Sequence, residues 1–179
     1  MTSESPKPPR ENNFAASDVL QILRDHHWLD ADPSPAQSAW CERAAALLGP
    51  QSPDRAALES LLSLIFHYDA REILATLDAQ VVMSRYAARD ALRLLANLLL
   101  DTTALTTDRF REIVDALKSQ LDIRGRELFH PLRLALAGRS GEGDLDRVAF
   151  LLDDAAAANF SVPVKTARTR IIEFCSFFD

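Results

Sequence analysis

Residues 89–100 read RDALRLLANLLL, and this stretch decides the fold class. Alanine, leucine and arginine are among the strongest helix formers. The whole chain of 179 residues contains only 5 glycines, and 47% of its residues are apolar. That composition suffices for one substantial core or two small lobes. We therefore expect a globular all-α protein, a multi-helix bundle of about eight or nine helices in one or two small lobes.

Six of these helices are expected before residue 122. Serine, aspartate and threonine cap helix N-termini, and proline is favoured in the first turn. The expected starts are Ser17, Pro35, Ser52–Pro53, Asp69, Ser84 and the threonine-rich residues 101–108. The first helix should end at about Trp28, and the fourth should run through Leu77. The connections are short, so consecutive helices should pack as antiparallel or steeply crossing neighbours.

Residues 130–138, HPLRLALAG, place an arginine within an apolar run. Proline tolerates the first turn of a helix and glycine often ends one, so the spacing predicts a two-turn helix from Pro131 to Gly138. On that helix Arg133 points about 100° away from Leu132 and is presented outward. Its guanidinium could stack on a base, contact a phosphate or pair with a carboxylate. Composition alone favours the ion pair.

The next residues, 138–154, read GRSGEGDLDRVAFLLDD and carry three glycines before a helical pattern. Asp144 is the expected N-cap of a helix through Leu145, Val148, Leu151 and Leu152. The exposed backbone amides of the glycine-rich part could meet a ligand. The alternative is a plain connecting loop.

Charge is distributed unevenly along the chain. The formal net charge of -6 argues against a general polyanion binder, because nucleic-acid affinity comes largely from lysine and arginine. Residues 109–139 nevertheless contain seven basic residues against four acidic ones, a local charge of +3. The basic residues are Arg109, Arg111, Lys118, Arg124, Arg126, Arg133 and Arg139. A local surface of the protein could therefore be positive.

Motifs for catalysis, metals or membranes are missing from the sequence. We find no glycine-rich phosphate loop, no HExxH and no recognisable nucleophile motif, so no active site, cofactor or metal is expected. Cys41 and Cys175 lie in no metal-binding pattern and are expected to be buried, reduced thiols. No stretch has the length of a signal peptide core or a membrane span, which favours a cytoplasmic location.

The two ends of the chain differ from its middle. Residues 1–13 are rich in serine, proline and charge, which predicts a disordered tail before a helical domain over residues 14–160. Residues 161–179 are expected to add a C-terminal helix, with Lys165, Arg168 and Arg170 as a basic approach to it. Its aromatic side chains either dock on the core or form a contact surface for a protein partner or a second copy.

One known family shares the pattern of residues 106–152. "PLRLALAG" following "IRGRELFH" resembles the C-terminal, anticodon-binding part of bacterial glutamyl-tRNA synthetases, which are class I aminoacyl-tRNA synthetases. A weaker similarity of helix order extends back to about residue 36. The resemblance implies an all-helical domain that grips the anticodon arm of a tRNA, with glutamate tRNA as the first candidate.

The resemblance also implies which residues contact the RNA. Arg133 matches the arginine of the family's PLR motif, and the loop after the motif's glycine corresponds to residues 142–145. Arg124, Arg126 and Arg139 are added from the basic window, so the expected tRNA-binding residues are Arg124, Arg126, Arg133, Arg139, Glu142, Gly143, Asp144 and Leu145. Stacking of an arginine on an unstacked base is a recurrent contact in RNA recognition.

A synthetase also needs a nucleotide-binding fold with HIGH-like and KMSKS-like signatures, and neither signature occurs here. Three hypotheses follow. The first is a freestanding, non-catalytic tRNA-binding module. The second is a helical protein-interaction domain that has lost RNA binding, which the net charge and the acidic residues Glu142 and Asp144 favour. The third is the detached anticodon-binding part of a split or decayed synthetase.

Overall fold

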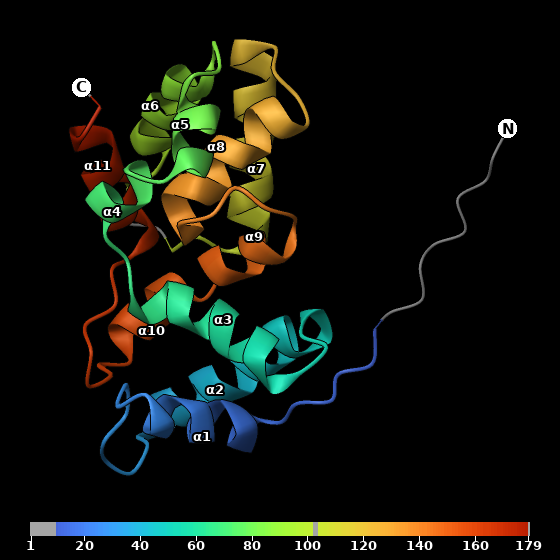
Figure 1. The fold of residues 1–179 in the computed structure, drawn as a ribbon, viewed down its shortest axis with the longest axis vertical. Helices are drawn as coiled ribbons and strands as arrows, with labels where there is room; N and C mark the ends of the chain where they lie inside the picture. Colours follow the sequence, from blue (N-terminus) through green and yellow to red (C-terminus); the bar gives the residue numbers. More distant parts are fainter. Residues whose placement is uncertain (1–9, 102–103, 179) are drawn as a thin grey trace, which may run out of the picture.

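A computed structural model describes residues 10–101 and 104–178 of the chain (Figure 1). Within these ranges the backbone forms eleven α-helices and one 3-10 turn, and no strand. The expected all-α fold class is thereby confirmed, with more helices than anticipated. The elements are α1 (Ala16–Asp25), α2 (Pro35–Leu48), η1 (Gly49–Gln51), α3 (Arg55–Phe66), α4 (Ala70–Leu74), α5 (Leu77–Met83), α6 (Ala88–Leu98), α7 (Thr107–Leu121), α8 (Arg126–Ala137), α9 (Asp144–Ala149), α10 (Leu152–Ala157) and α11 (Ala167–Ser176).

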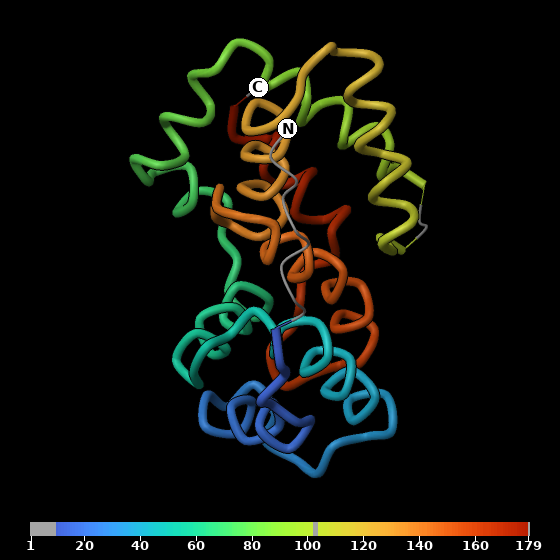
Figure 2. The backbone as a smooth tube through the Cα atoms, turned by 90° about the vertical axis from the view of Figure 1, so that its right-hand side faces the viewer, coloured from blue at the N-terminus to red at the C-terminus, as the bar shows by residue number. Residues whose placement is uncertain are grey.

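The helices form two groups stacked along the long axis of the molecule (Figure 1, Figure 2). Helices α1, α2, α3 and α10 make the lower group, and α4 to α8 with α11 make the upper group. Helix α9 lies between them, in contact with α2, α3 and α8. The buried apolar side chains nevertheless form one continuous cluster, which extends from Val19 in α1 to Phe174 in α11. The two groups therefore share one hydrophobic core.

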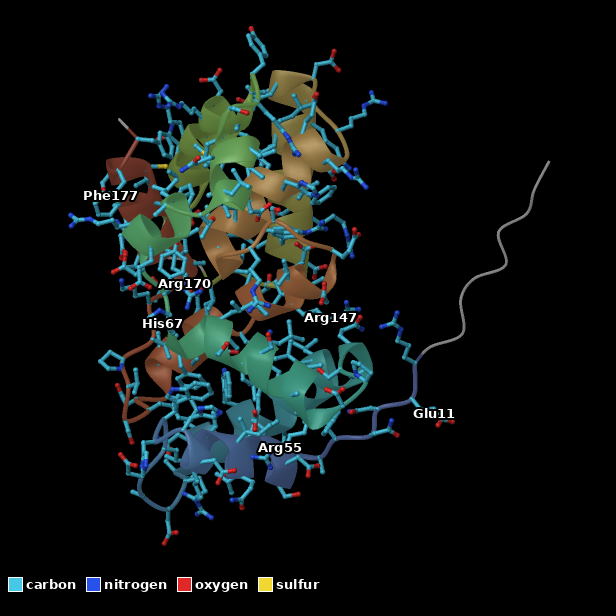
Figure 3. All side chains as sticks on the ribbon, in the orientation of Figure 1. Glu11, Arg55, His67, Arg147, Arg170 and Phe177 are labelled. Atoms are coloured by element: carbon cyan, nitrogen blue, oxygen red, sulfur yellow. The ribbon has the colours of Figure 1, made fainter. Side chains whose placement is uncertain are left out.

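Arg170 of α11 joins the two groups from the inside. Its side chain is fully buried, at 0% exposure, and donates to the carbonyls of Leu64 and Leu136, each at 2.9 Å, and of Ile65 at 2.7 Å. These carbonyls belong to the last turns of α3 and α8, where a helix lacks internal donors and carries the negative end of its dipole. Burial lowers the pKa of Arg170 to about 10, so the guanidinium stays charged at neutral pH. Figure 3 shows the residue near the junction of the groups.

The burial of Arg170 makes part of the predicted basic approach to the last helix wrong. Lys165 pairs with Glu173 at 2.7 Å, and of the three basic residues only Arg168 is exposed. The physical reason is tertiary: the carbonyls that Arg170 satisfies come from two helices distant in sequence. The composition of residues 161–179 gives no indication of these distant carbonyls.

Helix α8 begins at Arg126, so the predicted short helix starting at Pro131 is wrong. Proline lacks the N–H that would donate to the carbonyl four residues earlier, and α8 has one hydrogen bond fewer at that point. Leu128, Leu132 and Ala135 are each 0% exposed, and their packing keeps the helix continuous through the proline. Gly138 does end the helix in the left-handed conformation, with φ at 84°, as expected.

Several other helix boundaries also differ from expectation. Ser17 lies inside α1, where Asp18 accepts a hydrogen bond from the Ala15 amide at 2.7 Å. Ser84 ends α5 instead of starting α6, and its hydroxyl donates back to a carbonyl of α5. Residues 70–83 form α4 and α5 where one helix was expected, and residues 144–157 form α9 and α10. The extra helices are short segments with their own ends, which periodicity alone does not separate.

The tail predicted for residues 1–13 falls mainly on residues 1–9, which lie outside the described residues. Asn12 donates its side-chain amide to the Ala45 carbonyl at 3.1 Å, and Phe14 packs against the core. Cys41 and Cys175 are buried and form no disulfide within the described part of the chain. Burial raises the pKa of the Cys41 thiol to about 11.

Candidate nucleic-acid interface

Arg133 is held by α9 and by the loop that follows α8. Its Nε and Nη2 donate to the two carboxylate oxygens of Asp146 at 2.8 and 2.9 Å, and its Nη1 donates to the Gly141 carbonyl at 3.1 Å. The Arg133 and Asp146 side chains are only 13% and 17% exposed. The guanidinium also lies 4.8 Å from the centre of the Phe129 ring. Arg133 therefore shows the ion pair that composition favoured, and its contact with a base stays a prediction. The expected outward presentation of its side chain is wrong, because the guanidinium turns to Asp146 and Gly141.

The loop between α8 and α9 is fixed at three places. Besides the bond from Arg133 to Gly141, the Ser140 hydroxyl donates to Asp78 of α5 at 2.7 Å. Arg139 donates to the Ser60 hydroxyl of α3 at 3.1 Å. These bonds tie the loop to both groups of helices. The glycine-rich stretch is therefore a firmly anchored surface of the protein.

The other predicted loop residues lie at different depths. Glu142 is exposed, and Gly143 is the N-cap of α9, a position that was expected for Asp144. Asp144 is the half-buried first residue of that helix. Leu145 is only 4% exposed and belongs to the core. In this conformation the loop exposes Gly141 and Glu142, while the Leu145 side chain is covered.

Arg124 and Arg126 flank a tight turn between α7 and α8. Asp122 ends α7 with φ at 49°, and Gly125 precedes α8 with φ at 57° and ψ at -133°, a conformation that favours glycine. Both arginine side chains are exposed, and neither forms an ion pair with another described residue. The turn thus presents two cations to solvent from adjacent helix ends.

A third arginine extends this positive surface. Nη1 of Arg85, between α5 and α6, donates to the Arg126 carbonyl and lies 3.2 Å from Nδ1 of His130. Burial lowers the pKa of His130, and the charges of Arg85, Arg126 and Arg133 lower it further, against a smaller opposing effect of Asp78. The cationic side chains of Arg85, Arg126 and Arg133 therefore all lie close enough to His130 to affect its pKa.

Three of the seven basic residues in the 109–139 window are neutralised by carboxylates. Arg109 pairs with Asp101 at 2.8 Å, Arg111 pairs with Asp108 at 3.4 Å, and Arg133 pairs with Asp146. The window residues without a carboxylate partner in the described ranges are Lys118, Arg124, Arg126 and Arg139. Lys118, Arg124 and Arg126 therefore lie near the turn from α7 to α8, together with the exposed carboxylates Asp115, Asp122 and Glu127.

Sequence reasoning missed Arg85 and Arg147. Arg85 lies outside the basic window, and only the folded chain brings it to α8. Arg147 of α9 is half-buried at the junction of the two groups, where Figure 3 shows it. Neither residue has a local charge pattern that would have marked it.

No group of three or more metal-ligating side chains is present in the described part of the chain. No helix within those ranges has both the length and the apolar composition that crossing a membrane requires. The candidate site consists of the exposed charged residues at the turn from α7 to α8 and of the loop that follows α8.

The comparisons with known proteins give one match. A family model described as an anticodon binding domain matches residues 17–156, which is most of the chain and includes α2 to α9 and all but one residue each of α1 and α10. No curated protein and no solved structure gives a significant match.

Proposed function

The chain belongs to the anticodon binding domain family, and we propose that it binds the anticodon arm of a tRNA without a catalytic activity of its own. The observation that carries this proposal is the pair of exposed cations, Arg124 and Arg126, that have no carboxylate partner in the described ranges. Arg85 adds a third positive charge beside them. Phosphate groups of an RNA backbone are the ligands that such a surface attracts.

The anchored loop completes the proposed interface. Arg133 contributes through its bonds to Gly141 and Asp146, which restrain the loop. A preformed surface loses less conformational entropy on binding than a flexible one. A direct stacking contact from Arg133 to an anticodon base requires the guanidinium to leave Asp146. On this proposal, Arg133 stabilises the loop in the free protein, and it contacts the RNA only if its bonds to Asp146 break.

The relation to glutamyl-tRNA synthetases and the choice of glutamate tRNA are the finer parts of the proposal. They are supported by the order "IRGRELFH" and "PLRLALAG" at residues 123–138. The detached part of a split synthetase would bind the same RNA. It would also restore activity to a catalytic domain supplied as a separate chain.

The test is an electrophoretic mobility shift with glutamate tRNA and with a tRNA of unrelated anticodon, each at two salt concentrations. We expect binding that weakens as salt rises, because counterions are released from the RNA. The Arg124→Gln/Arg126→Gln variant should bind more weakly and show a salt slope smaller by roughly one to two.

A matched control distinguishes the effect of losing Arg124 and Arg126 from the effect of losing any two positive charges. Arg24→Gln/Arg111→Gln also removes two positive charges, but from arginines paired with Asp32 and Asp108. The control should keep nearly the wild-type affinity. Absence of any shift at low salt, or equal losses in both variants, contradicts the proposal.

The interaction-domain alternative is favoured by one observation on α11 and the residue after it. Ile172 and Phe177 are 44% and 45% exposed, and exposed apolar side chains can take part in a protein contact. Phe177→Asp would abolish capture of a partner on this reading and leave tRNA binding unchanged. A truncation before α11 cannot serve as the test, since it would remove Arg170.

A further inference from the structure

A hollow of about 540 Å³ lies between the end of α7 and the start of α8. It is lined by Asp115, Lys118, Ser119, Arg124, Gly125 and Phe129. Its volume falls within the range of about 300–1,000 Å³ that is usual for small-ligand sites. We propose that this hollow receives one unstacked nucleotide of the bound RNA, with its phosphate at Lys118 and Arg124 and its base against Phe129. This inference rests on the proposed function.

The charges in the hollow suit a nucleotide better than a simple anion. Lys118 and Arg124 are exposed and form no ion pair with another described residue. Asp115 lies in the same wall and would repel a free anion that fills the whole site. A carboxylate can instead accept a hydrogen bond from a ribose hydroxyl or from the amino group of a base. The two cations and the carboxylate therefore match a ligand with one charged end and one neutral, donating end.

Phe129 provides the surface for the base. Its side chain is half-buried, and the guanidinium of Arg133 lies 4.8 Å from the ring centre. Because Arg133 is itself bound to Asp146 and Gly141, the ring is held on that side by a fixed group. Stacking of a base on an aromatic side chain contributes about 1–3 kcal/mol in single-stranded RNA recognition. The ring is therefore positioned before the nucleotide arrives.

Gly125 is one of the residues that line the hollow, and it is exposed. A Cβ atom built on this glycine meets no heavy atom within 4 Å, so the space next to the turn is unfilled. The Ser119 hydroxyl lines the opposite helix and offers both a donor and an acceptor. A ribose or a base edge entering here meets hydrogen-bonding groups and no steric obstacle.

The first experiment measures fluorescence anisotropy of a labelled anticodon stem-loop RNA with the full chain. Phe129→Leu removes the aromatic face without changing charge, and its affinity should fall about 5- to 100-fold, as the loss of one stacked base predicts. Phe129→Tyr keeps the ring and should bind like the wild type. Lys118→Gln should weaken binding and reduce the salt slope by about one. Phe150→Leu, which changes a half-buried aromatic residue just after α9 and outside this hollow, is the matched control and should bind normally.

The second experiment locates the nucleotide directly. A stem-loop RNA that carries 4-thiouridine in its loop is crosslinked to the wild-type chain, digested with trypsin and analysed by mass spectrometry. The adduct is expected on the peptide of residues 127–133, which contains Phe129. Thermal melting of each variant shows whether it is folded.

The outcomes separate the two proposals. If the wild-type chain binds neither tRNA nor the stem-loop, the proposed function fails and the nucleotide site fails with it. If the RNA binds but folded Phe129→Leu retains full affinity and the adduct lies outside residues 115–133, only the nucleotide site is wrong. Should Phe129→Leu prove unfolded, the position of the adduct on wild-type protein decides.

Discussion

Arg133 of α8 and Asp146 of α9 form a two-pronged ion pair, with donor–acceptor distances of 2.8 and 2.9 Å. The pair is largely shielded from water and connects the helix with the PLR sequence to the helix after the glycine loop. The arginine expected to face a nucleotide is thus part of the scaffold that shapes the loop.

The coupling between these two residues should be measurable in a double-mutant cycle. We expect an interaction energy of about 1–3 kcal/mol from urea unfolding of Arg133→Met, Asp146→Asn and the double variant, since charge-assisted bonds in a shielded site are strong. Arg133→Lys should not restore it, because an ammonium group lacks the planar fork. The exposed Arg111–Asp108 pair is the comparison, and its coupling should stay below about 0.5 kcal/mol. Equal couplings for the two pairs would contradict this assignment.

Replacing Arg170 by methionine should destabilise the protein by about 3 kcal/mol or more. The substitution leaves the carbonyls of Leu64, Ile65 and Leu136 without their donor, and a buried acceptor left unpaired costs about 1–3 kcal/mol. The measurement is the midpoint of urea unfolding. Arg168→Met, two positions earlier on the exposed face of α11, should change stability by less than about 0.5 kcal/mol. A small effect at position 170 would show that the joint between the helix groups does not depend on this guanidinium.

Gly125→Ala should affect stability and RNA binding together. The backbone there has φ at 57° and ψ at -133°, which an alanine adopts only with strain of about 1–3 kcal/mol. No atom lies within 4 Å of the added methyl group, so the effect is conformational and not steric. Thermal melting and tRNA titration of the same sample would check both effects. Unchanged values in the two measurements would mean that the turn tolerates other conformations.

Stability should decrease as the pH falls from about 7 toward 5. Burial and the neighbouring arginines lower the pKa of His130 in the folded chain below its unfolded value of about 6.5. As the pH drops through that unfolded value, the unfolded chain takes up a proton before the folded chain does, so unfolding is favoured. Above pH 7 this contribution is absent. Melting temperatures between pH 8 and 5 should therefore fall less steeply for His130→Gln, and identical slopes would contradict the prediction.

Helical periodicity and composition were sufficient to predict the all-α fold and most of the long helices. The end of α8 at Gly138 was also predictable, because a glycine after an apolar run is a local signal. Pro131 misled the prediction, since the packing that carries α8 through it involves other helices. The buried position of Arg170 was not predictable for the same reason: three of the four carbonyls to which it donates lie 34 to 106 residues away.

Only the charged residues of the candidate site were predictable from the sequence, and their contacts were not. The basic window contains Arg124 and Arg126, which the structure leaves exposed. Asp146, however, is 13 residues from Arg133, and nothing in the intervening sequence indicates that the two side chains meet. Arg85 reaches α8 from 41 residues away. Pairing across such separations depends on how helices pack, which one sequence does not specify.

The position of Arg170 also bears on how the protein forms during synthesis. The Ile65 carbonyl is made 105 residues before its donor, and the Leu136 carbonyl 34 residues before. While the ribosome is still translating the intervening segments, the carbonyl groups at the ends of α3 and α8 lack the guanidinium that donates to them in the folded protein. A nascent chain that stops short of residue 170 should therefore remain open at the junction, accessible to chaperones and proteases, until translation supplies that side chain.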